Sequence, residues 1–434
     1  ATMSKNRNDE AWEAIFADRE AVDVIAREGR LLISADEIRR YREPRLMAKF
    51  DHRVNLPEIF QRHSLAILPV SRGDYVVGPF EAYCRFGEAS SPVRRFSVPA
   101  SLESLDGGNI PSETIALSCA AASGILSDFL GEETLVPTVS GRMSSDCFSF
   151  TIRGAGGEPF PVDVDHAQIE IDAAYEGAHS LALIEAKRDL SEDFLVRQLY
   201  YPFRVWSQRV RKRVRPVFLV HSNGLFRLYE YEFTDPMCYN SLRLVQQRTY
   251  SLEDTDFTRR DLLDVLRETP WDEEPEVAFP QANSLERVLN LCELLLTQPM
   301  TPLDVTAAYD FTLRQAGYYT AAARFLGLIR KDGAFFRLTD EGRRVLSLSY
   351  RKRQAALTSR MARSRVFRAL LNLGAHKPSP VTVEEARELL RTERPPDVWS
   401  EKTLSRRAST AVSWVNWLLR PQGEEEQQLS FFPG

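Results

Sequence analysis

The residues best suited to chemistry are acidic residues and a lysine at the ends of two apolar segments. Asp172 ends the run QIEID, and after twelve further residues Glu185 and Lys187 end the run LIEAK. Successive side chains of a β-strand point to opposite faces, so Glu185 and Lys187 share one face of their strand. Two neighbouring strands would therefore bring Asp172, Glu185 and Lys187 together.

Carboxylate oxygens in this arrangement suit a hard divalent cation such as Mg²⁺. We expect Asp172 and Glu185 to bind Mg²⁺ together with the backbone carbonyl of Ala186, and Glu170 to support these ligands. Lys187 would orient or help to deprotonate an attacking water, while the cation neutralises charge that develops on a phosphoryl group. The pattern therefore predicts Mg²⁺-dependent hydrolysis of a phosphodiester.

Two further residues could join this site. Glu113 begins a predicted helix upstream of the strands and could add a metal contact, although an acidic residue there also interacts favourably with the helix dipole. Gln198 lies on the helix predicted after the second strand and could reach the site or could be an ordinary surface glutamine. The alternative for the whole pattern is the polar face of a hairpin without a chemical role.

The elements expected around these residues form a mixed α+β or α/β arrangement, with a mixed sheet core flanked by helices. Periodicity predicts helices over 111–130 and 191–211, and strands over 147–153, 167–175, 180–187, 214–220 and 225–233. Upstream of them it predicts helices over 9–26 and 34–41, with Ser34 as an N-cap, and strands over 64–70 and 74–80. Strands over 167–175 and 180–187 carry the candidate site.

These residues resemble the PD-(D/E)XK nuclease superfamily, whose fold is of the restriction endonuclease-like type. Asp172, Glu185 and Lys187 match the two acidic residues and the lysine of its motif, whereas Ile171 stands where the motif name has proline. The runs QIEIDAAYE, LIEAK, RQLYYPFR and RQAGYYTAAARFLGLI look like a group of prokaryotic type II restriction endonucleases with C-terminal winged-helix segments. The resemblance spans residues 10–420 and is strongest over 165–206 and 312–329.

The resemblance implies a sequence-specific endonuclease that acts on double-stranded DNA and depends on Mg²⁺. It also implies a homodimer in the cytoplasm of a prokaryote, with a cognate DNA methyltransferase in the same host. A modification-dependent or repair nuclease of the same fold is one alternative. A non-catalytic winged-helix DNA-binding regulator is another, but it leaves the cluster of Asp172, Glu185 and Lys187 unexplained.

Composition is compatible with this interpretation. The chain has 434 residues, of which 27% are charged and 43% hydrophobic, which allows two or three domains. Its apolar runs fall short of the roughly 20 residues that a membrane helix needs, so we expect no membrane segment. Five scattered cysteines without a CxxC pair argue against a disulfide framework or a structural zinc site.

The net charge of −5 conceals an asymmetry between the two halves of the chain. Residues 284–420 hold 23 Lys or Arg against 13 Asp or Glu, a net charge of +10. The tail 421–434 carries −3, so residues 1–283 carry −12. A basic C-terminal half predicts contact with a polyanion. Arg351–Arg368 alone contains seven basic residues and no acidic one, although such a run is usually a solvated helix face.

The C-terminal half is predicted to be mostly helical. Helices that begin at 284 and 302, a helix over 318–329, a hairpin over 329–339 that turns at Asp332-Gly333, and a helix over 340–348 are typical of a winged helix. A second helical unit is expected from helices over 353–373, 381–390 and 400–419. Winged helices bind DNA in many proteins and bind other proteins in some.

We expect basic and aromatic residues in three places to contact DNA. In the catalytic half they are Arg204, Arg209, Arg211, Lys212 and Arg213. In the winged helix they are Arg314, Tyr318, Tyr319, Thr320, Arg324, Arg330, Lys331 and Arg337. In the second helical unit they are Lys402, Arg406 and Arg407.

The resulting domain plan has six segments. Residues 1–100 form an α/β region with possible DNA contacts, and 101–250 form the nuclease core. Residues 251–283 form an exposed linker, rich in Asp, Glu and Pro over 271–280. Residues 284–350 form the winged helix, 351–420 the second helical domain, and 421–434 an acidic tail.

Overall fold

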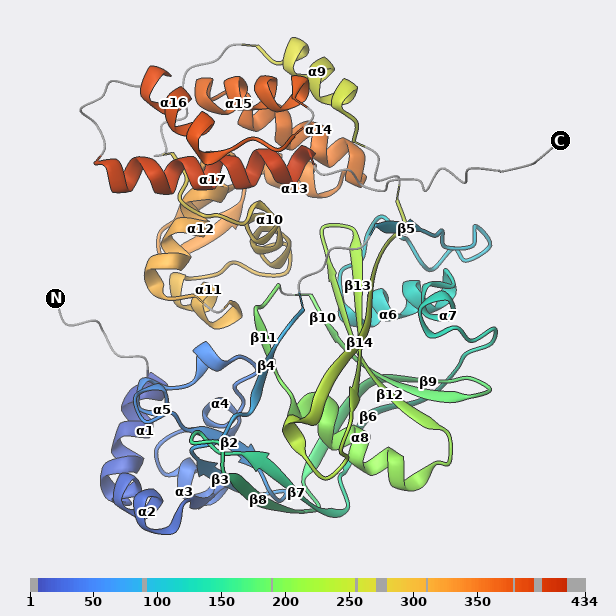
Figure 1. Cartoon of the computed structure of the whole chain (residues 1–434), viewed down its shortest axis with the longest axis vertical. Coiled ribbons are helices and arrows are strands. Elements are labelled where there is room, and N and C mark those ends of the chain that lie inside the picture. The colour runs from blue at the N-terminus through green and yellow to red at the C-terminus, as the bar shows by residue number, and fades with distance from the viewer. Residues whose placement is uncertain are drawn as a thin grey trace.

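Three parts follow one another along the chain in this computed structural model (Figure 1). They are an N-terminal α/β part (7–78), a central part built around a large sheet (79–253) and a mostly helical C-terminal part (257–419). The structure describes residues 7–87, 92–188, 190–253, 257–270, 279–309, 311–377, 379–393 and 400–419. Among these residues, none of the helices combines the length and the apolar character that a bilayer crossing requires.

The N-terminal part packs short helices against a three-stranded antiparallel sheet of order β1-β3-β2. Its elements are α1 (Arg7–Asp18), α2 (Ala21–Glu28), β1 (Leu31–Ser34), α3 (Ala35–Arg39), α4 (Pro44–Met47), η1 (Arg53–Asn55), α5 (Glu58–Arg62), β2 (Ala66–Pro69) and β3 (Asp74–Gly78). Ser34 caps α3 as predicted, because its hydroxyl accepts from the Glu37 amide. The single helix predicted over 9–26 is two helices, because Glu20 adopts the left-handed conformation.

Both faces of this small sheet are buried. Ile67 and Val77 belong to the core of the N-terminal part, together with Trp12 and Phe60. Leu68, on the other face, belongs to a core shared with the central part. The N-terminal part is therefore packed firmly onto the central part.

The central part contains a seven-stranded mixed sheet of order β5-β14-β13-β12-β10-β9-β6, as the mixed α/β prediction required. β10 pairs in parallel with β12 and antiparallel with β9. The elements are β4 (Tyr83–Arg85), β5 (Val93–Arg95), α6 (Glu113–Ala122), α7 (Ile125–Leu130), β6 (Val136–Ser144), β7 (Cys147–Arg153), β8 (Pro159–Asp165), β9 (Gln168–Glu176), β10 (Ser180–Lys187), β11 (Asp193–Leu195), α8 (Arg197–Arg209), β12 (Arg213–Ser222), β13 (Leu225–Phe233), η2 (Tyr239–Ser241) and β14 (Leu242–Ser251).

Successive side chains of each strand point to opposite faces of the sheet, so a separate hydrophobic core lies on each face. Ala182, Ile184 and Ala186 of β10 face α6 and α7. Leu181 and Leu183 face the opposite core, which contains residues of α8 and of the β7–β8 hairpin. The side chains of Glu185 and Lys187 continue the row of Leu181 and Leu183, so they point toward α8.

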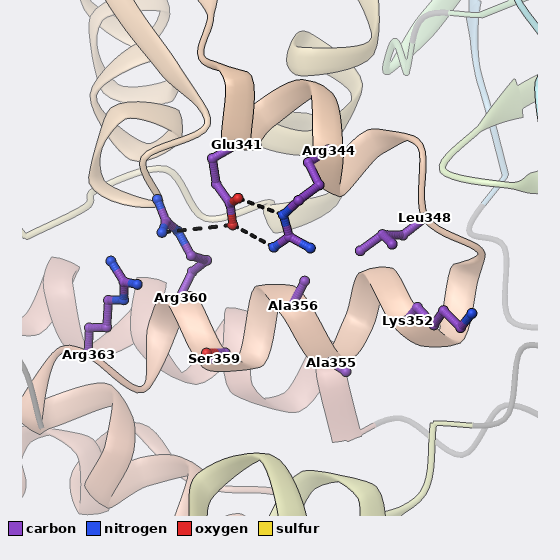
Figure 2. A pocket seen from close by; sticks show the side chains of 9 residues that line it. All are labelled: Glu341, Arg344, Leu348, Lys352, Ala355, Ala356, Ser359, Arg360 and Arg363. Carbon is purple, nitrogen blue, oxygen red and sulfur yellow. Dashed lines mark hydrogen bonds and ion pairs between the residues drawn. The ribbon is translucent and has the colours of Figure 1, made fainter. Parts of the chain in front are cut away.

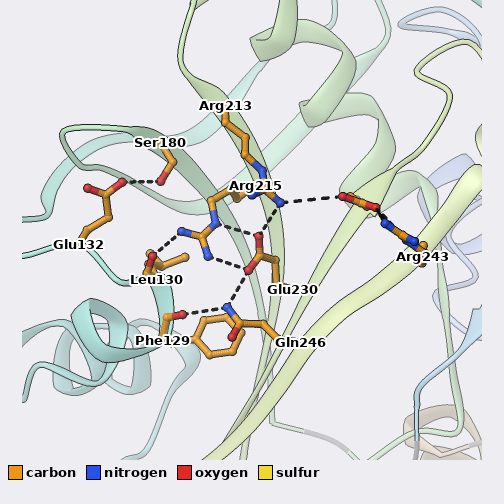
Figure 3. A network of polar contacts seen from close by, with 10 residues as sticks. Phe129, Leu130, Glu132, Ser180, Arg213, Arg215, Glu230, Arg243 and Gln246 are labelled. Atoms are coloured by element: carbon orange, nitrogen blue, oxygen red, sulfur yellow. Dashed lines mark hydrogen bonds and ion pairs between the residues drawn. The ribbon is translucent and has the colours of Figure 1, made fainter.

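A network of buried polar groups fixes the end of α7 to the sheet (Figure 3). Glu230 of β13 accepts hydrogen bonds of 2.8 and 2.7 Å from Arg215 of β12 and one of 2.8 Å from Gln246 of β14. Arg215 and Gln246 also donate to the carbonyls of Leu130 and Phe129, respectively. The network therefore satisfies two carbonyls at the end of α7, one through Arg215 and one through Gln246, as well as the buried charged pair.

Some predicted helices of this part differ in extent. The helix predicted over 111–130 is broken by Gly124, whose φ of 89° is left-handed, into α6 and α7. The helix predicted from 191 begins only at Arg197, because β11 pairs with β4 first. Strands β6, β8 and β14 were not predicted, and Pro residues in β6 and β8 weaken their strand signal.

The C-terminal part consists of helices and one hairpin. Its elements are α9 (Arg259–Glu268), α10 (Leu285–Leu294), α11 (Pro302–Ala308), α12 (Leu313–Phe325), β15 (Ile329–Asp332), β16 (Phe335–Leu338), α13 (Asp340–Leu346), α14 (Tyr350–Met361), α15 (Arg365–His376), α16 (Val383–Glu393) and α17 (Glu401–Leu419). The N-caps Ser284 and Thr301 and the hairpin turn after Asp332 agree with the sequence prediction.

The segment predicted as an exposed linker contains α9, whose Leu262 and Leu266 are buried in the C-terminal core. The amphipathic pattern of α9 is short and an acidic segment follows it closely. The sequence pattern therefore favoured a linker over a helix here. Residues 271–278 of the predicted linker and the predicted acidic tail lie outside the described residues. Phe279, directly after that gap, is buried against Phe367.

Candidate active site

The antiparallel pairing of β9 and β10 brings Asp172 and Glu185 side by side. Ile184 pairs with Ala173, so the next residue of β10 lies beside the preceding residue of β9. The Oδ2 atom of Asp172 accepts a hydrogen bond of 2.8 Å from the backbone amide of Ala186. This bond fixes the carboxylate of Asp172 against the end of β10.

Lys187 and Gln198 both contact the carboxylate of Glu185. The Nζ atom of Lys187 lies 2.6 Å from Glu185 Oε1, and the Nε2 atom of Gln198 donates to the same oxygen at 2.8 Å. Gln198 reaches the site because α8 starts one residue earlier and crosses this face of the sheet. Its other side-chain atom, Oε1, is buried and has no hydrogen-bond partner among the described residues.

These groups line a cavity of about 180 Å³. The structure brings together here all six side chains that the sequence pattern singled out for the site: Glu113, Glu170, Asp172, Glu185, Lys187 and, from α8, Gln198. Glu170 is about half exposed and forms an ion pair of 3.4 Å with Arg142 of β6. The backbone carbonyl of Ala186 as a metal ligand stays a prediction.

Two residues of the N-terminal part also line the cavity, Lys49 and Asp51. The loop that carries them is held by the β4–β11 pair: Leu195 donates its amide to the carbonyl of Asp51 at 3.0 Å, and the Tyr83 hydroxyl donates to the carbonyl of Phe50 at 2.9 Å. Sequence reasoning missed Asp51, because a lone acidic residue in a loop carries no motif. Only the packing of the two parts brings it to the site.

Burial and charge tune the central pair. Burial and, to a smaller extent, the nearby Asp172 carboxylate raise the pKa of the Glu185 carboxyl to about 7, against the influence of Lys187. Burial alone would lower the pKa of Lys187, but the carboxylates of Glu185 and Asp51 outweigh it and keep the pKa above its ordinary value. Lys187 is therefore charged at neutral pH.

The charge balance of the cavity favours a bound cation. Five carboxylates line it, those of Asp51, Glu113, Glu170, Asp172 and Glu185. Three cationic side chains, those of Lys49, Lys187 and Arg197, oppose them. The donors are oxygen atoms, which Mg²⁺ prefers, and when Glu185 is ionised a divalent cation would offset the excess of two negative charges.

The arginines expected to contact DNA in the central part have different environments. Arg204 is buried, with 5% of its surface exposed, and donates to the Tyr200 hydroxyl and to the Ser149 carbonyl, both at 2.9 Å. It lies against aromatic rings of the core, so the expectation that it contacts DNA is wrong. Arg211 is exposed. Arg209, Lys212 and Arg213 are partly or fully exposed and pair with acidic residues.

In the C-terminal part, two of the expected contact residues are core residues. Tyr319 is 8% exposed and stacks on Phe311 at 4.3 Å, and the Thr320 hydroxyl bonds to a carbonyl of its own helix. The other candidates are exposed or half-buried: Arg314, Tyr318, Arg324, Arg330, Lys331, Arg337, Lys402, Arg406 and Arg407. Tyr319 was misplaced because a pair of tyrosines on a helix does not reveal which one faces the core.

Three models of protein families match the chain. Residues 9–77 match "Domain of unknown function (DUF6996)", residues 78–251 match "Domain of unknown function (DUF6997)" and residues 287–422 match "Domain of unknown function (DUF7226)". No curated protein and no solved structure matches the chain. The boundary between the first two matches, at residues 77 and 78, coincides with the transition from the N-terminal part to the central part.

Proposed function

We propose that the protein is a Mg²⁺-dependent endonuclease that hydrolyses phosphodiester bonds of double-stranded DNA at specific sequences, as a type II restriction endonuclease does. The convergence of Asp172, Glu185 and Lys187 in one cavity carries the proposal. Two carboxylates and a charged lysine on adjacent strand ends are a group that can support metal-dependent phosphodiester hydrolysis, and a purely DNA-binding protein has no need of it. On this proposal the central sheet is a PD-(D/E)XK core.

Asp172 and Glu185 would hold Mg²⁺, with the Ala186 carbonyl and, more weakly, Glu113 as further donors. Mg²⁺ bound there would offset negative charge at the phosphoryl group and lower the pKa of a bound water. Such a cation is compatible with the oxygen donors, with the negative balance of the cavity and with the Oε1 atom of Gln198, which has no hydrogen-bond partner among the described residues.

The residues of the chain have distinct roles in this proposal. The Lys187 ammonium group positions the attacking water and attracts the scissile phosphate. Gln198 keeps the Glu185 carboxylate oriented through its 2.8 Å hydrogen bond. Burial disfavours the ionised form of Glu185, so a bound cation would be what stabilises its negative charge.

The C-terminal part would grip DNA as a winged helix over 284–350, with the second helical unit beside it. Arg330, Lys331 and Arg337 of the β15–β16 hairpin are exposed, as a DNA-contacting wing requires. Cutting both strands of a palindrome is simplest for a homodimer, so we propose a homodimer. As the partner of a restriction endonuclease we also propose a cognate methyltransferase in the host.

Incubation of the full chain with unmethylated phage DNA, with Mg²⁺ or with EDTA, tests the proposal. We expect discrete fragments in Mg²⁺ and none in EDTA. Lys187→Met and Asp172→Asn should each reduce the cleavage rate at least about a hundredfold, and gel-shift assays in Ca²⁺ should find DNA binding retained. Methionine is preferred to alanine at this position because it keeps the side-chain volume of lysine. The Glu185 carboxyl, which loses its cationic partner in this variant, can become neutral by taking up a proton.

Lys377→Met is the matched control, since Lys377 pairs with Glu385 on the C-terminal part away from the cavity. It should cut at the wild-type rate. Cleavage by Lys187→Met at the wild-type rate would refute the assignment. Absence of cleavage on unmethylated DNA, with cleavage of methylated DNA, would identify a modification-dependent nuclease. Mg²⁺-independent binding without cleavage of either DNA would favour the regulator.

A further inference from the structure

The basic run Arg351–Arg368 is the sequence feature that the nuclease proposal leaves unused. Several of its members have structural roles. Arg353 is buried and donates to the side-chain oxygen of Asn223 at 2.9 Å, which ties α14 to the central part. Arg368 donates to four backbone carbonyls near the ends of α9 and α14. Arg351 forms an ion pair of 2.7 Å with an aspartate of α9.

Three other members of the run face a cavity of about 420 Å³ between α13 and α14 (Figure 2). They are Lys352, Arg360 and Arg363, and Arg344 of α13 joins them. Among the described residues that line the cavity, Glu341 is the one carboxylate. It accepts two hydrogen bonds of 2.7 Å from Arg344 and lies 3.9 Å from Arg360.

Positive charge therefore exceeds negative charge in this cavity, by four cationic side chains to one carboxylate. Burial and the neighbouring Arg363 lower the pKa of Arg360, which reflects this crowding of like charges. Lys352 has no hydrogen-bond or ion-pair partner in the described ranges of the chain. An anion in the cavity would relieve the repulsion between the arginines.

The shape of the cavity favours a small ligand over a DNA backbone. Its volume lies within the roughly 300–1,000 Å³ of small-molecule sites, and Leu348, Ala355 and Ala356 give it an apolar wall. A duplex presents a convex backbone that touches protruding side chains and needs no such wall. Guanidinium groups match phosphate oxygens in geometry and charge.

We propose that the cavity between α13 and α14 binds a small phosphorylated ligand with at least two negative charges, of the nucleotide type. The phosphate groups would lie against Arg344, Arg360 and Arg363, with Lys352 at the other end of the cavity. The apolar body of the ligand would lie against Ala355 and Ala356. This proposal does not depend on the nuclease activity, because it concerns binding at a different site.

Isothermal titration calorimetry of the full chain with ATP, pyrophosphate, adenosine and a 12-base-pair duplex tests it. EDTA in the buffer prevents contributions from a metal at the nuclease site. We expect ATP and pyrophosphate to bind with one site per chain and adenosine not to bind. The double variant Lys352→Gln/Arg363→Gln should bind ATP about tenfold more weakly, since lost charge-assisted hydrogen bonds have effects of that order.

Glu341→Gln should have the opposite effect, because it frees Arg344 for the ligand and removes the one repulsive charge. A variant that had merely unfolded could not bind more tightly. A lower affinity in the double variant and a higher affinity in Glu341→Gln would therefore together exclude a loss of folding as the cause. Arg351→Gln removes a charge from the same helix outside the cavity and should bind like the wild type. Binding of the duplex alone, equal binding of adenosine, or unchanged affinity in the double variant would overturn the proposal.

Discussion

The side-chain amide of Asn290 donates a hydrogen bond of 2.6 Å to the backbone carbonyl of Arg188, the residue that follows Lys187. Asn290 lies on α10 and is fully buried, and it also donates to the Ser222 hydroxyl at 2.9 Å. Its Oδ1 accepts from the Tyr309 hydroxyl at 2.6 Å. The C-terminal part is therefore bonded directly to the end of the strand that carries the candidate catalytic lysine.

Replacement of Asn290 by Ala should destabilise the chain by about 2–4 kcal/mol, because several buried polar groups lose their partner at once. Urea unfolding followed by tryptophan fluorescence measures this change. Asn372→Ala, at an exposed position of α15, is the control and should change stability by less than about 0.5 kcal/mol. Equal effects of the two substitutions would show that the Asn290 contacts contribute nothing.

Replacement of Arg215 alone should destabilise the protein much more than replacement of both Arg215 and Glu230, which form a buried pair. Arg215→Met removes the two shortest charge-assisted hydrogen bonds of the 1% exposed Glu230 side chain, leaves it only Gln246 and the more distant Arg213, and should cost about 3–5 kcal/mol of unfolding free energy. Arg215→Met/Glu230→Leu should regain most of that loss, because both charges are gone. Equilibrium urea unfolding of both variants checks this.

Arg243→Met is the matched control for that cycle, since Arg243 pairs with Glu232 at the surface of the same sheet. Its loss should cost less than about 1 kcal/mol. A cost for Arg215→Met as small as that of the control would contradict the interpretation.

His221 should make the protein less stable at acidic pH. Burial, together with neighbouring arginines, lowers its pKa to about 3, whereas the unfolded chain has a histidine pKa near 6.5. Between these values the unfolded state binds a proton that the folded state does not, so stability falls as the pH falls below about 6.5. At pH 5 this group should cost roughly 2 kcal/mol relative to pH 7.

Urea unfolding of wild type and His221→Leu at pH 7 and pH 5 measures this contribution. The loss of stability between the two pH values should be smaller in the variant, by roughly that amount. His63→Leu, at an exposed position, should leave the loss unchanged. An identical loss in His221→Leu and wild type would show that the pKa of His221 is not lowered in the folded state.

Metal binding at the candidate site should weaken as the pH falls through about 7. The Glu185 carboxyl must be ionised to bind a cation, and burial raises its pKa to about 7. The Kd for Ca²⁺ should be nearly constant above that pH and should rise toward tenfold per pH unit below it. Calorimetric titrations from pH 5.5 to 8.5 measure the profile.

Glu170→Gln, which removes a half-exposed carboxylate of the same cavity, should keep this pH dependence, and Glu185→Gln should abolish tight binding. A Kd independent of pH between 5.5 and 8.5 would exclude Glu185 as the controlling ligand.

The sequence predicted those elements of the site that have a local signal. The alternation around Asp172 and Glu185 predicted both strands and their shared face, and the Ser34 cap predicted the start of a helix. It could not predict Asp51, which reaches the cavity only through packing of the N-terminal part. It also could not distinguish the buried Arg204 from its exposed neighbours, because the aromatic residues that enclose Arg204 come from a distant hairpin and its own helix.

The loop with Lys49 and Asp51 has an evolutionary consequence. The N-terminal part has its own core, yet it supplies one wall of a cavity whose candidate catalytic groups belong to the central sheet. Recombination that exchanged this part between related genes would replace that wall and leave Asp172, Glu185 and Lys187 in place. Such an exchange would alter the shape of the cavity and the carboxylate that acts on Lys187 in a single event, so access to the cavity and its electrostatics would change together in descendants of this gene.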